Sequence, residues 1–260
     1  ITDAIFNDLD ADGDDDLLIV GEFMGIEIFI NQGGIFTRRE EGQVKDLKGW
    51  WNTIHKVDLD NDGDFDFIVG NHGLNSRFRA SPEKPITLFS SDFDKNGFID
   101  PVLAFRASNG KDYPYALRHN LIDQMKGLKK KFPNYESFKD ASMDVIFAKN
   151  DLDVSNQLKV TILSSIVLIN KGNLEFDVLE LPIEAQFSSI YAINTDDFDK
   201  DGDQDIILGG NLFNVKPEVG RYDASYGVYL ENKGNMKFKS HKNGNGFFLK
   251  GEGRDIIVHE

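Results

Sequence analysis

The chain has 260 residues, and its 29 Lys and Arg against 44 Asp and Glu give a formal net charge of −15 at pH 7. This length supports a sizeable buried core in one domain or at most two. The negative charge argues against binding to a phosphate backbone, which requires clustered Lys and Arg. With no Cys, disulfides and thiolate metal sites are excluded. The longest apolar run, around residues 162–169, is broken by Ser164 and Ser165 and is too short for a membrane-spanning helix.

The chain begins ITDAIFND, with neither a Met nor a signal-like stretch. This start indicates a processed or partial product.

Four short acidic segments share the pattern D-x-D-x-[DN]-G-x-x-D. In chain order they are residues 8–16 (DLDADGDDD), 58–66 (DLDNDGDFD), 92–100 (DFDKNGFID) and 197–205 (DFDKDGDQD). With Asp196 they contain 20 of the 44 acidic residues. Carboxylates this close raise each other's pKa and oppose compaction, so bound cations are expected. One such turn is ordinary, but four with matching residues indicate a repeated site.

The spacing indicates the cation. Acidic or amide side chains at positions 1, 3 and 5 can turn inward while Gly at position 6 permits a sharp turn. Position 7 offers its carbonyl and the Asp at position 9 closes an all-oxygen site, which suits Ca²⁺ better than Mg²⁺. An EF-hand is excluded because it needs Glu at position 12, where this chain has Ile19, Val69, Leu103 and Leu208.

Each acidic segment lies between two predicted strands. The apolar runs DLLIVGE, DFIVGN, DPVLAF and DIILGGN follow the segments, and AIFN, IHKV, ITLFSS and YAIN precede them. Each unit is therefore predicted to be a β-hairpin whose connection is a calcium loop.

A second element, opening N-x-G, recurs at residues 31–36, 170–176 and 232–238 and resembles a tight turn that leads into a strand. The hairpin with its acidic segment is followed by a third strand, the N-x-G turn and a fourth strand. Together they make a four-stranded antiparallel unit of the length typical of propeller blades. The sequence therefore predicts an all-β fold, a calcium-binding β-propeller or part of one over residues 1–260, with about five blade units. One unit would lack a loop and contain KVTIL, IVLIN and FDVLEL (residues 159–181), and the incomplete last unit would open with GRDIIVHE (residues 253–260).

A helical insertion is predicted near residues 118–147. Apolar residues recur at helical spacing over 118–132, opposite a Lys cluster, and a second short helix is expected near 142–147. A solvated face explains the lysines better than an acidic partner or anionic glycan. The residues are Leu121, Ile122, Met125, Leu128 and Phe132 on the apolar side and Lys126, Lys129, Lys130 and Lys131 near the other.

The acidic pattern followed by an apolar strand resembles the FG-GAP/VCBS repeat of integrin α-subunit propellers and many bacterial surface proteins. The stretch from KDYPYALRHN to MDVIF, with LPIEAQFSSIYAIN and VGRYDASYG, resembles the C-terminal propeller of ASPIC/UnbV-type VCBS proteins. Those are exported or lipid-anchored proteins of Gram-negative bacteria, often encoded near outer-membrane nutrient-uptake systems.

The resemblance implies up to four Ca²⁺ ions with five ligand residues each. The third set has the fewest negative charges and is expected to bind most weakly. The implied ligands are Asp8, Asp10, Asp12, Asp14 and Asp16; Asp58, Asp60, Asp62, Asp64 and Asp66; Asp92, Asp94, Asn96, Phe98 and Asp100; and Asp197, Asp199, Asp201, Asp203 and Asp205, where Asp14, Asp64, Phe98 and Asp203 bind through their carbonyls.

The favoured function is a non-catalytic calcium-binding surface propeller that binds another protein of a bacterial cell envelope, accessory to an outer-membrane nutrient-uptake complex. An extracytoplasmic location fits because calcium sites of moderate affinity are filled only where calcium is plentiful. The expected partner is an envelope or outer-membrane protein, with a glycan as an alternative and no nucleic acid. Arg77, Phe78 and Arg79 are candidate interface anchors, although internal packing explains them equally well.

The alternative function is a carbohydrate-binding or polysaccharide-cleaving, lyase-like propeller, in which Trp50 and Trp51 stack on sugar rings. Core packing explains both Trp residues better. No G-x-S-x-G, H-E-x-x-H or P-loop motif is present, and His55 and His72 at strand ends are better explained as structural. A polar loop at residues 221–226 is a further candidate for a binding face.

Overall fold

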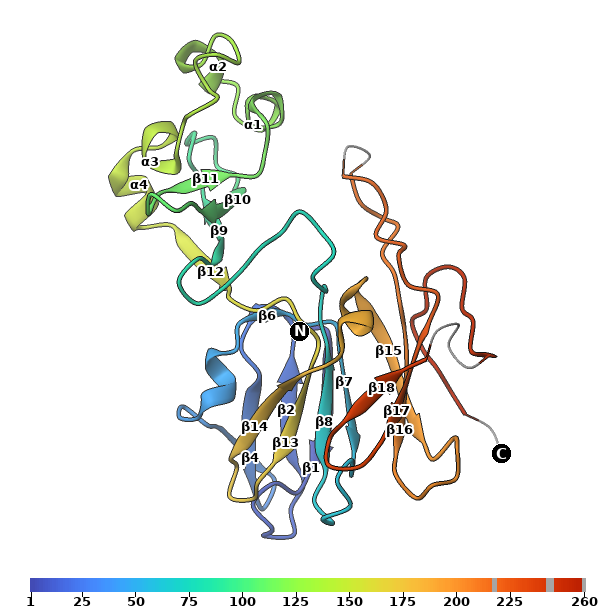
Figure 1. Cartoon of the computed structure of the whole chain (residues 1–260). Helices are drawn as coiled ribbons and strands as arrows, with labels where there is room; N and C mark the ends of the chain where they lie inside the picture. The colour runs from blue at the N-terminus through green and yellow to red at the C-terminus, as the bar shows by residue number, and fades with distance from the viewer. Residues whose placement is uncertain (217–218, 242–245, 259–260) are drawn as a thin grey trace. The chain divides into compact units, whose positions relative to one another are not determined.

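The computed structural model describes residues 1–216, 219–241 and 246–258 (Figure 1). The chain forms two compact units: the sheet unit, Ile1–Arg77 with Ile162–Glu260, and the inserted unit, Phe78–Thr161. Antiparallel sheets predominate over helices in the chain as a whole, as the sequence predicted. In the described part, no helix is long and apolar enough to cross a membrane.

The sheet unit contains three four-stranded antiparallel meanders. In each of them, the strands lie side by side in the order in which they occur along the chain of this unit. The N-terminal sheet is β1(Asp3–Asn7), β2(Asp16–Val20), β4(Glu27–Gln32) and β5(Ile35–Arg38). The middle sheet is β7(Thr53–Val57), β8(Asp66–Gly70), β13(Ile166–Asn170) and β14(Phe176–Glu180). The C-terminal sheet is β15(Ile190–Asp196), β16(Asp205–Gly210), β17(Val228–Asn232) and β18(Phe238–Ser240). A small sheet pairs β3(Glu22–Met24) with β6(Gly49–Trp50), and two short 3-10 helices, η1(Gln43–Asp46) and η2(Ile183–Gln186), complete the unit.

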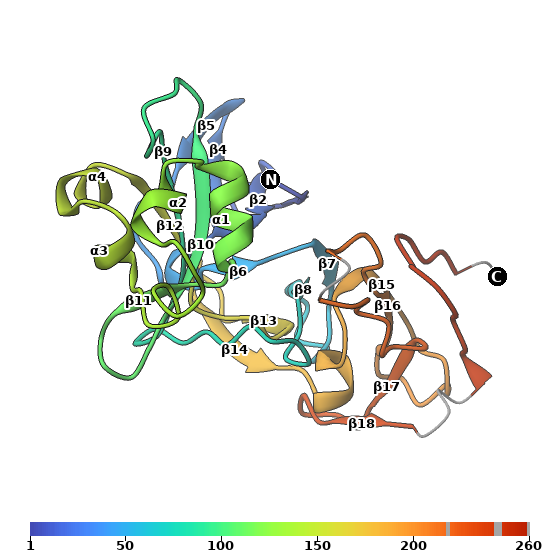
Figure 2. The same cartoon turned by 90° about the horizontal axis from the view of Figure 1, so that it is seen from above.

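The middle sheet is buried on both faces, which explains its continuous apolar strands. In β8, Phe67 and Val69 belong to the core shared with the N-terminal sheet. The intervening Ile68 belongs to the core shared with the C-terminal sheet. Side chains alternate between the faces of a strand, so a strand covered on both sides must be apolar throughout. Figure 2 shows the three sheets following one another, with the middle sheet between the others.

The first strands of the three sheets are linked by side-chain hydrogen bonds. Thr53 Oγ1 in β7 donates to Asp3 Oδ2 in β1 at 2.9 Å, and the amide of Ile54 donates to the same oxygen at 3.0 Å. On the other side of β7, His55 Nε2 lies 3.0 Å from Thr195 Oγ1 in β15. The first strand of each sheet therefore faces the first strand of the next.

The inserted unit has one sheet and four short helices. The sheet has the order β11(Asp112–Pro114), β10(Asp100–Arg106), β9(Ile86–Ser91), β12(Asn156–Val160). The helices α1(Arg118–Gln124), α2(Leu128–Lys131), α3(Met143–Ile146) and α4(Lys149–Asp153) lie in the sequence between β11 and β12. They bury a separate core that includes Leu121, Met125 and Phe132. The predicted helix over 118–132 is thus two helices, interrupted around Gly127, a residue unfavourable in a helix interior.

The predicted unit without a calcium loop is not a separate sheet. Residues of KVTIL lie in β12, which pairs with β9, whereas IVLIN and FDVLE are β13 and β14 and complete the middle sheet through the pairing of Ile166 with Val69. The spacing argument failed because it assumed that strands close in sequence pair with each other. The inserted unit separates β8 from its partner β13, so each of the four described four-stranded sheets contains one acidic loop.

The predicted opening strand at residues 253–260 is also wrong over its described part. Residues 253–258 form no strand, and residues 259–260 lie outside the described residues. The segment instead runs along the C-terminal sheet, where Asn194 Nδ2 donates to the Ile256 carbonyl at 3.0 Å and the Arg254 guanidinium lies over the Tyr191 ring. Gly209 of β16 gives this segment room to approach, since a Cβ there would lie 3.3 Å from Ile256 Cδ1.

Candidate metal centres in four acidic loops

Each acidic segment connects the two strands of a β-hairpin, as the sequence predicted. Loop 1 (residues 8–16) joins β1 to β2, and loop 2 (58–66) joins β7 to β8. Loop 3 (92–100) joins β9 to β10, and loop 4 (197–205) joins β15 to β16. In the three sheets of the sheet unit the loop joins an edge strand to its neighbour, whereas loop 3 joins the two central strands of the inserted sheet.

The loop backbone requires residues that tolerate positive φ. The position 6 glycines, Gly13, Gly63, Gly97 and Gly202, have φ of 95°, 95°, 91° and 100°. Position 4 is also left-handed in every loop, with φ between 59° and 64°, although no glycine stands there. A Cβ on any of the four glycines would meet nothing within 4 Å, so the backbone angle and not space selects glycine.

Backbone amides hold the first Asp of each loop in an inward orientation. In loop 1, Asp8 Oδ1 and Oδ2 accept from the amides of Asp12 and Gly13 at 3.2 and 3.0 Å. The same pair of bonds occurs in loops 3 and 4, and in loop 2 the Gly63 amide donates to Asp58 Oδ2 at 3.1 Å. The carboxylates are therefore oriented by the chain itself.

Three carboxylates of each loop lie close enough to bind one metal ion, with candidate ligand atoms within 4.8 Å of one another. Positions 1 and 3 contribute in every loop, joined by position 9 in loops 1 and 3 and by position 5 in loops 2 and 4. The groups are Asp8, Asp10 and Asp16; Asp58, Asp60 and Asp62; Asp92, Asp94 and Asp100; and Asp197, Asp199 and Asp201. The structure does not test the remaining implied ligands, Asp12, Asp14, Asp64, Asp66, Asn96, Phe98, Asp203 and Asp205.

The two Asp residues among these that stand at position 7 of loops 1 and 4 have side chains engaged elsewhere. Asp14 Oδ2 accepts from the Gly33 amide at 2.8 Å, and Asp203 Oδ1 accepts from Asn61 Nδ2 at 2.9 Å. Both stand at position 7, where the expected ligand is the backbone carbonyl.

Loop 2 provides a direct test of whether a cation fits. Asp58 Oδ1 and Asp60 Oδ1 are buried and have no hydrogen-bond partner among the described residues. A buried carboxylate oxygen without a donor is costly, and a cation is the partner that removes the cost. Because every candidate donor is oxygen, the loops suit a hard divalent cation.

The position 3 carboxylates show the electrostatic cost of this clustering. The pKa of Asp10, Asp60 and Asp199 is raised by desolvation and then by the neighbouring position 5 carboxylate. Burial also raises the pKa of Asp66 at position 9 to about 6. A bound cation would oppose both effects by favouring the ionised forms.

The position 9 Asp has a second role that the sequence did not reveal. It is at most 3% exposed in every loop. In loops 1 to 4, its Oδ2 accepts from the position 2 amide at 3.0, 3.1, 3.1 and 3.2 Å. Its Oδ1 accepts from the amide of the Asn that opens the N-x-G element, Asn31, Asn170 or Asn232, at 2.8 to 2.9 Å. In loop 3, Gln124 Nε2 of α1 donates instead at 3.2 Å.

We call this arrangement the aspartate clamp: the position 9 Asp with its two amide donors. The side-chain amides of the same three Asn residues return to the position 8 carbonyl of the loop, at 3.0 to 3.3 Å. The recurrence of N-x-G was visible in the sequence, but its pairing with position 9 requires the register of the third strand.

Loops 2 and 4 are connected directly. Besides the bond from Asn61 to Asp203, Asn232 Nδ2 donates to the carbonyl of Leu59 in loop 2 at 3.0 Å. Asn232 is fully buried, and its side chain thus links the C-terminal sheet to the middle sheet.

The other sequence candidates are mostly structural. Trp51 is fully buried, and its indole N–H donates to the carbonyls of Met24 and Leu47, both at 3.1 Å, so it offers no ring to a sugar. Phe78 is only 9% exposed and packs on Tyr115, so it is not an exposed anchor. Burial lowers the pKa of His55, and it lowers that of His72 to about 4.

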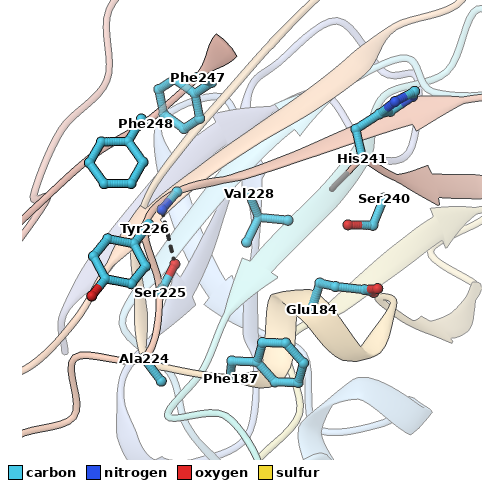
Figure 3. Close-up of a pocket in the computed structure, with 11 residues that line it drawn as sticks. Glu184, Phe187, Ala224, Ser225, Tyr226, Val228, Ser240, His241, Phe247 and Phe248 are labelled. Carbon is cyan, nitrogen blue, oxygen red and sulfur yellow. Dashed lines mark hydrogen bonds between the residues drawn. The ribbon is translucent and has the colours of Figure 1, made fainter. Parts of the chain in front are cut away.

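A pocket of about 450 Å³ opens near residue 226 of the predicted polar loop. Figure 3 shows the rings of Tyr226, Phe247 and Phe248 on one side, with Glu184 and His241 on the other. Tyr226 and Phe248 stack at 5.2 Å with an interplanar angle of 11° and are 53% and 69% exposed. The sequence did not predict the participation of Phe248, which lies in a segment without regular structure.

The N-terminal part of the chain is similar to a known repeat family. Residues 8–69 match the FG-GAP-like repeat. The FG-GAP match begins at Asp8, the first residue of loop 1, and ends in β8, so it includes loops 1 and 2. No curated protein matches the chain. The match supports an FG-GAP repeat family, and the narrower resemblance to ASPIC/UnbV-type proteins stays a prediction.

The connection through Asn232 can be tested by substitution. We expect Asn232→Ala to lower the free energy of unfolding by about 2–3 kcal/mol, because it leaves buried carbonyls without donors. Asn31→Ala is the matched control: its side chain bonds only within its own sheet, and we expect about 1 kcal/mol. Urea denaturation measures both, and equal losses would show that the link from Asn232 to loop 2 contributes nothing.

Proposed function

We propose that this chain is a calcium-binding β-propeller, or part of one, that binds another protein of a bacterial cell envelope. The observation that carries the proposal is the repetition of one preorganised carboxylate loop between the first two strands, in chain order, of four sheets. Face-to-face packing of four-stranded meanders whose first strands face one another is the arrangement expected of propeller blades. The FG-GAP match over residues 8–69 supports the same conclusion, since such repeats often serve protein interaction.

Calcium is proposed to stiffen the blades and not to take part in chemistry. The ligands would be the carboxylates of positions 1, 3, 5 and 9 with the position 7 carbonyl, and the amide of Asn96 replaces one carboxylate in loop 3. Such open loops suit moderate affinity, which favours an extracytoplasmic location near the cell surface or outer membrane, where calcium is plentiful. The loops that connect the sheets would then form a rigid face on which a partner protein docks. The module would be non-catalytic and accessory to nutrient uptake.

The metal is tested by thermal unfolding with calcium, with magnesium and with excess chelator. At free calcium of about 100 Kd, each independent site adds about 2.7 kcal/mol. This corresponds to a rise in Tm of about 5–10 °C. Asp8→Asn should reduce the rise, whereas Asp15→Asn, which makes the same charge change at position 8 of the same loop, should leave most of it. A Tm that does not change between calcium and chelator would rule out structural calcium.

The interaction is tested by capture from solubilised cell envelopes with this protein as bait, in calcium and in chelator. We expect a stoichiometric envelope protein retained only with calcium, identified by mass spectrometry. The Asp8→Asn bait should retain less of it than the Asp15→Asn bait. Recovery of no partner under either condition would contradict the interaction module.

A carbohydrate-binding function is the second candidate, and the pocket beside Tyr226 favours it. Exposed aromatic faces next to a carboxylate match the apolar faces and hydroxyls of a sugar ring. The test is a screen of polysaccharides by affinity electrophoresis with Tyr226→Ala. Tyr135→Ala is the control, because Tyr135 is equally exposed, at 56%, but lies in the inserted unit. Retardation lost only in Tyr226→Ala would support this candidate, and no retardation of the unmodified protein would exclude it for the glycans screened.

A further inference from the structure

Two lysines occupy equivalent places beside loops 2 and 4. Lys171 and Lys233 each follow the Asn that opens an N-x-G element. Lys171 Nζ lies 4.0 Å from Asp60 Oδ2, and Lys233 Nζ lies 3.8 Å from Asp199 Oδ2. Asp60 and Asp199 both stand at position 3, so the two ammonium groups approach the same position of two different loops.

The backbone on both sides of each lysine is fixed by the same bonds. Before Lys171, the Asn170 amide is held by the aspartate clamp at 2.9 Å, and the Lys171 amide itself donates to the Glu175 carbonyl at 2.9 Å. Lys233 repeats both bonds, with the Asn232 amide at 2.8 Å from Asp205 and its own amide at 2.8 Å from the Lys237 carbonyl. The repeated turn therefore places the backbone of both lysines in the same way beside their loops.

Loops 1 and 3 lack this feature. Gln32 stands at the equivalent place beside loop 1, and loop 3 is bound by Gln124 of α1 in place of an N-x-G element. Within residues 1–216, 219–241 and 246–258, neither loop forms an ion pair with a basic side chain. In loops 2 and 4 the lysine opposes the rise in the position 3 pKa that desolvation and the position 5 carboxylate cause.

The electrostatic consequence has two parts. An ammonium about 4 Å from a carboxylate attracts it, and this attraction offsets the repulsion among the clustered acids when no metal is bound. The same ammonium repels a divalent cation that binds the same carboxylate. A fixed positive charge at this place therefore favours the metal-free loop over the metal-bound loop.

We propose that Lys171 and Lys233 are tethered counter-ions that hold loops 2 and 4 folded without metal and lower their affinity for calcium. Loop 1, which has the full set of carboxylates and no lysine, then binds calcium first. The inference rests on the proposed function in that the loops are taken to bind calcium. It adds an order of filling that the ligand pattern alone does not give, since loops 1, 2 and 4 have the same ligand types.

The two lysines are not equivalent in what else they contact. Lys233 Nζ also contacts Glu231, a buried carboxylate bonded in addition to His241 and approached by Lys239 at 3.6 Å. Lys233 therefore has a second partner when calcium occupies loop 4. No second ion pair is found for Lys171 among the described residues, so its effect on loop 2 is the larger.

The test follows each loop separately by amide NMR during calcium titration of the whole chain. Gly13, Gly63, Gly97 and Gly202 at position 6 provide one reporter for each loop. In the unmodified protein, Gly13 should respond at the lowest calcium concentration. In Lys171→Gln, the midpoint for Gly63 should fall by about three- to tenfold, and that for Gly202 should fall less in Lys233→Gln.

Two controls separate the counter-ion from a general change in charge. Lys171→Arg keeps the positive charge and should keep the midpoint for Gly63. Lys250→Gln removes an exposed lysine elsewhere in the sheet unit and should also leave it unchanged. In chelator, Lys171→Gln should melt at a lower temperature than Lys171→Arg, because the loop has lost its counter-ion.

The outcomes distinguish this inference from the proposed function. If none of the four glycines responds to calcium in the unmodified protein, the calcium proposal itself fails. If they respond but Lys171→Gln leaves the Gly63 midpoint where it was, or if Gly63 responds before Gly13 in the unmodified protein, the counter-ion inference alone is overturned.

Discussion

The aspartate clamp is the interaction on which the rest of the structure depends. One buried carboxylate receives an amide from the start of its own loop and, in three of the four sheets, an amide from the third strand. Hydrogen bonds to a charged acceptor are stronger than neutral ones, and a buried carboxylate without donors would be costly. The clamp therefore fixes the loop conformation and the register of the third strand together. It also explains why an acidic residue can end a loop and begin a buried strand in every repeat.

The clamp allows the remaining carboxylates to be concentrated. With the position 9 carboxylate held by fixed amides, the carboxylates of positions 1 and 3 face a common point. Partial desolvation and the neighbouring position 5 carboxylate raise the pKa of Asp10, Asp60 and Asp199 at position 3. The chain uses several kinds of positive partner for this surplus: backbone amides in every loop, side-chain amides between loops 2 and 4, and ammonium groups at two loops. Part of the repulsion among the clustered loop carboxylates is thus offset by partners that the chain itself supplies.

Much of this architecture could be predicted from the sequence, because the informative signals are local. The acidic pattern with glycine at position 6 predicted the turn, and apolar runs on either side predicted the hairpins. The cores on the two faces of β8 explain why Phe67, Ile68 and Val69 form an uninterrupted apolar run. Pairing between distant segments could not be predicted in this way. The partner of β8 lies beyond the inserted unit, and β12 joins the free side of β9. Core packing of Trp51 was predicted, but its hydrogen bond to the Met24 carbonyl was not.

The interruption of the middle sheet also bears on how the chain is made. β8 leaves the ribosome roughly 95 residues before β13, which at usual rates of synthesis corresponds to about 5–20 s. During that interval β8 has β7 as a neighbour and an open edge on its other side, and Ile68 lacks the C-terminal sheet that later covers it. The inserted unit has its own sheet and its own core, so it can fold while the middle sheet is still incomplete. The order of synthesis thus gives the nascent chain an exposed apolar edge that persists until the strand after the insertion arrives to cover it.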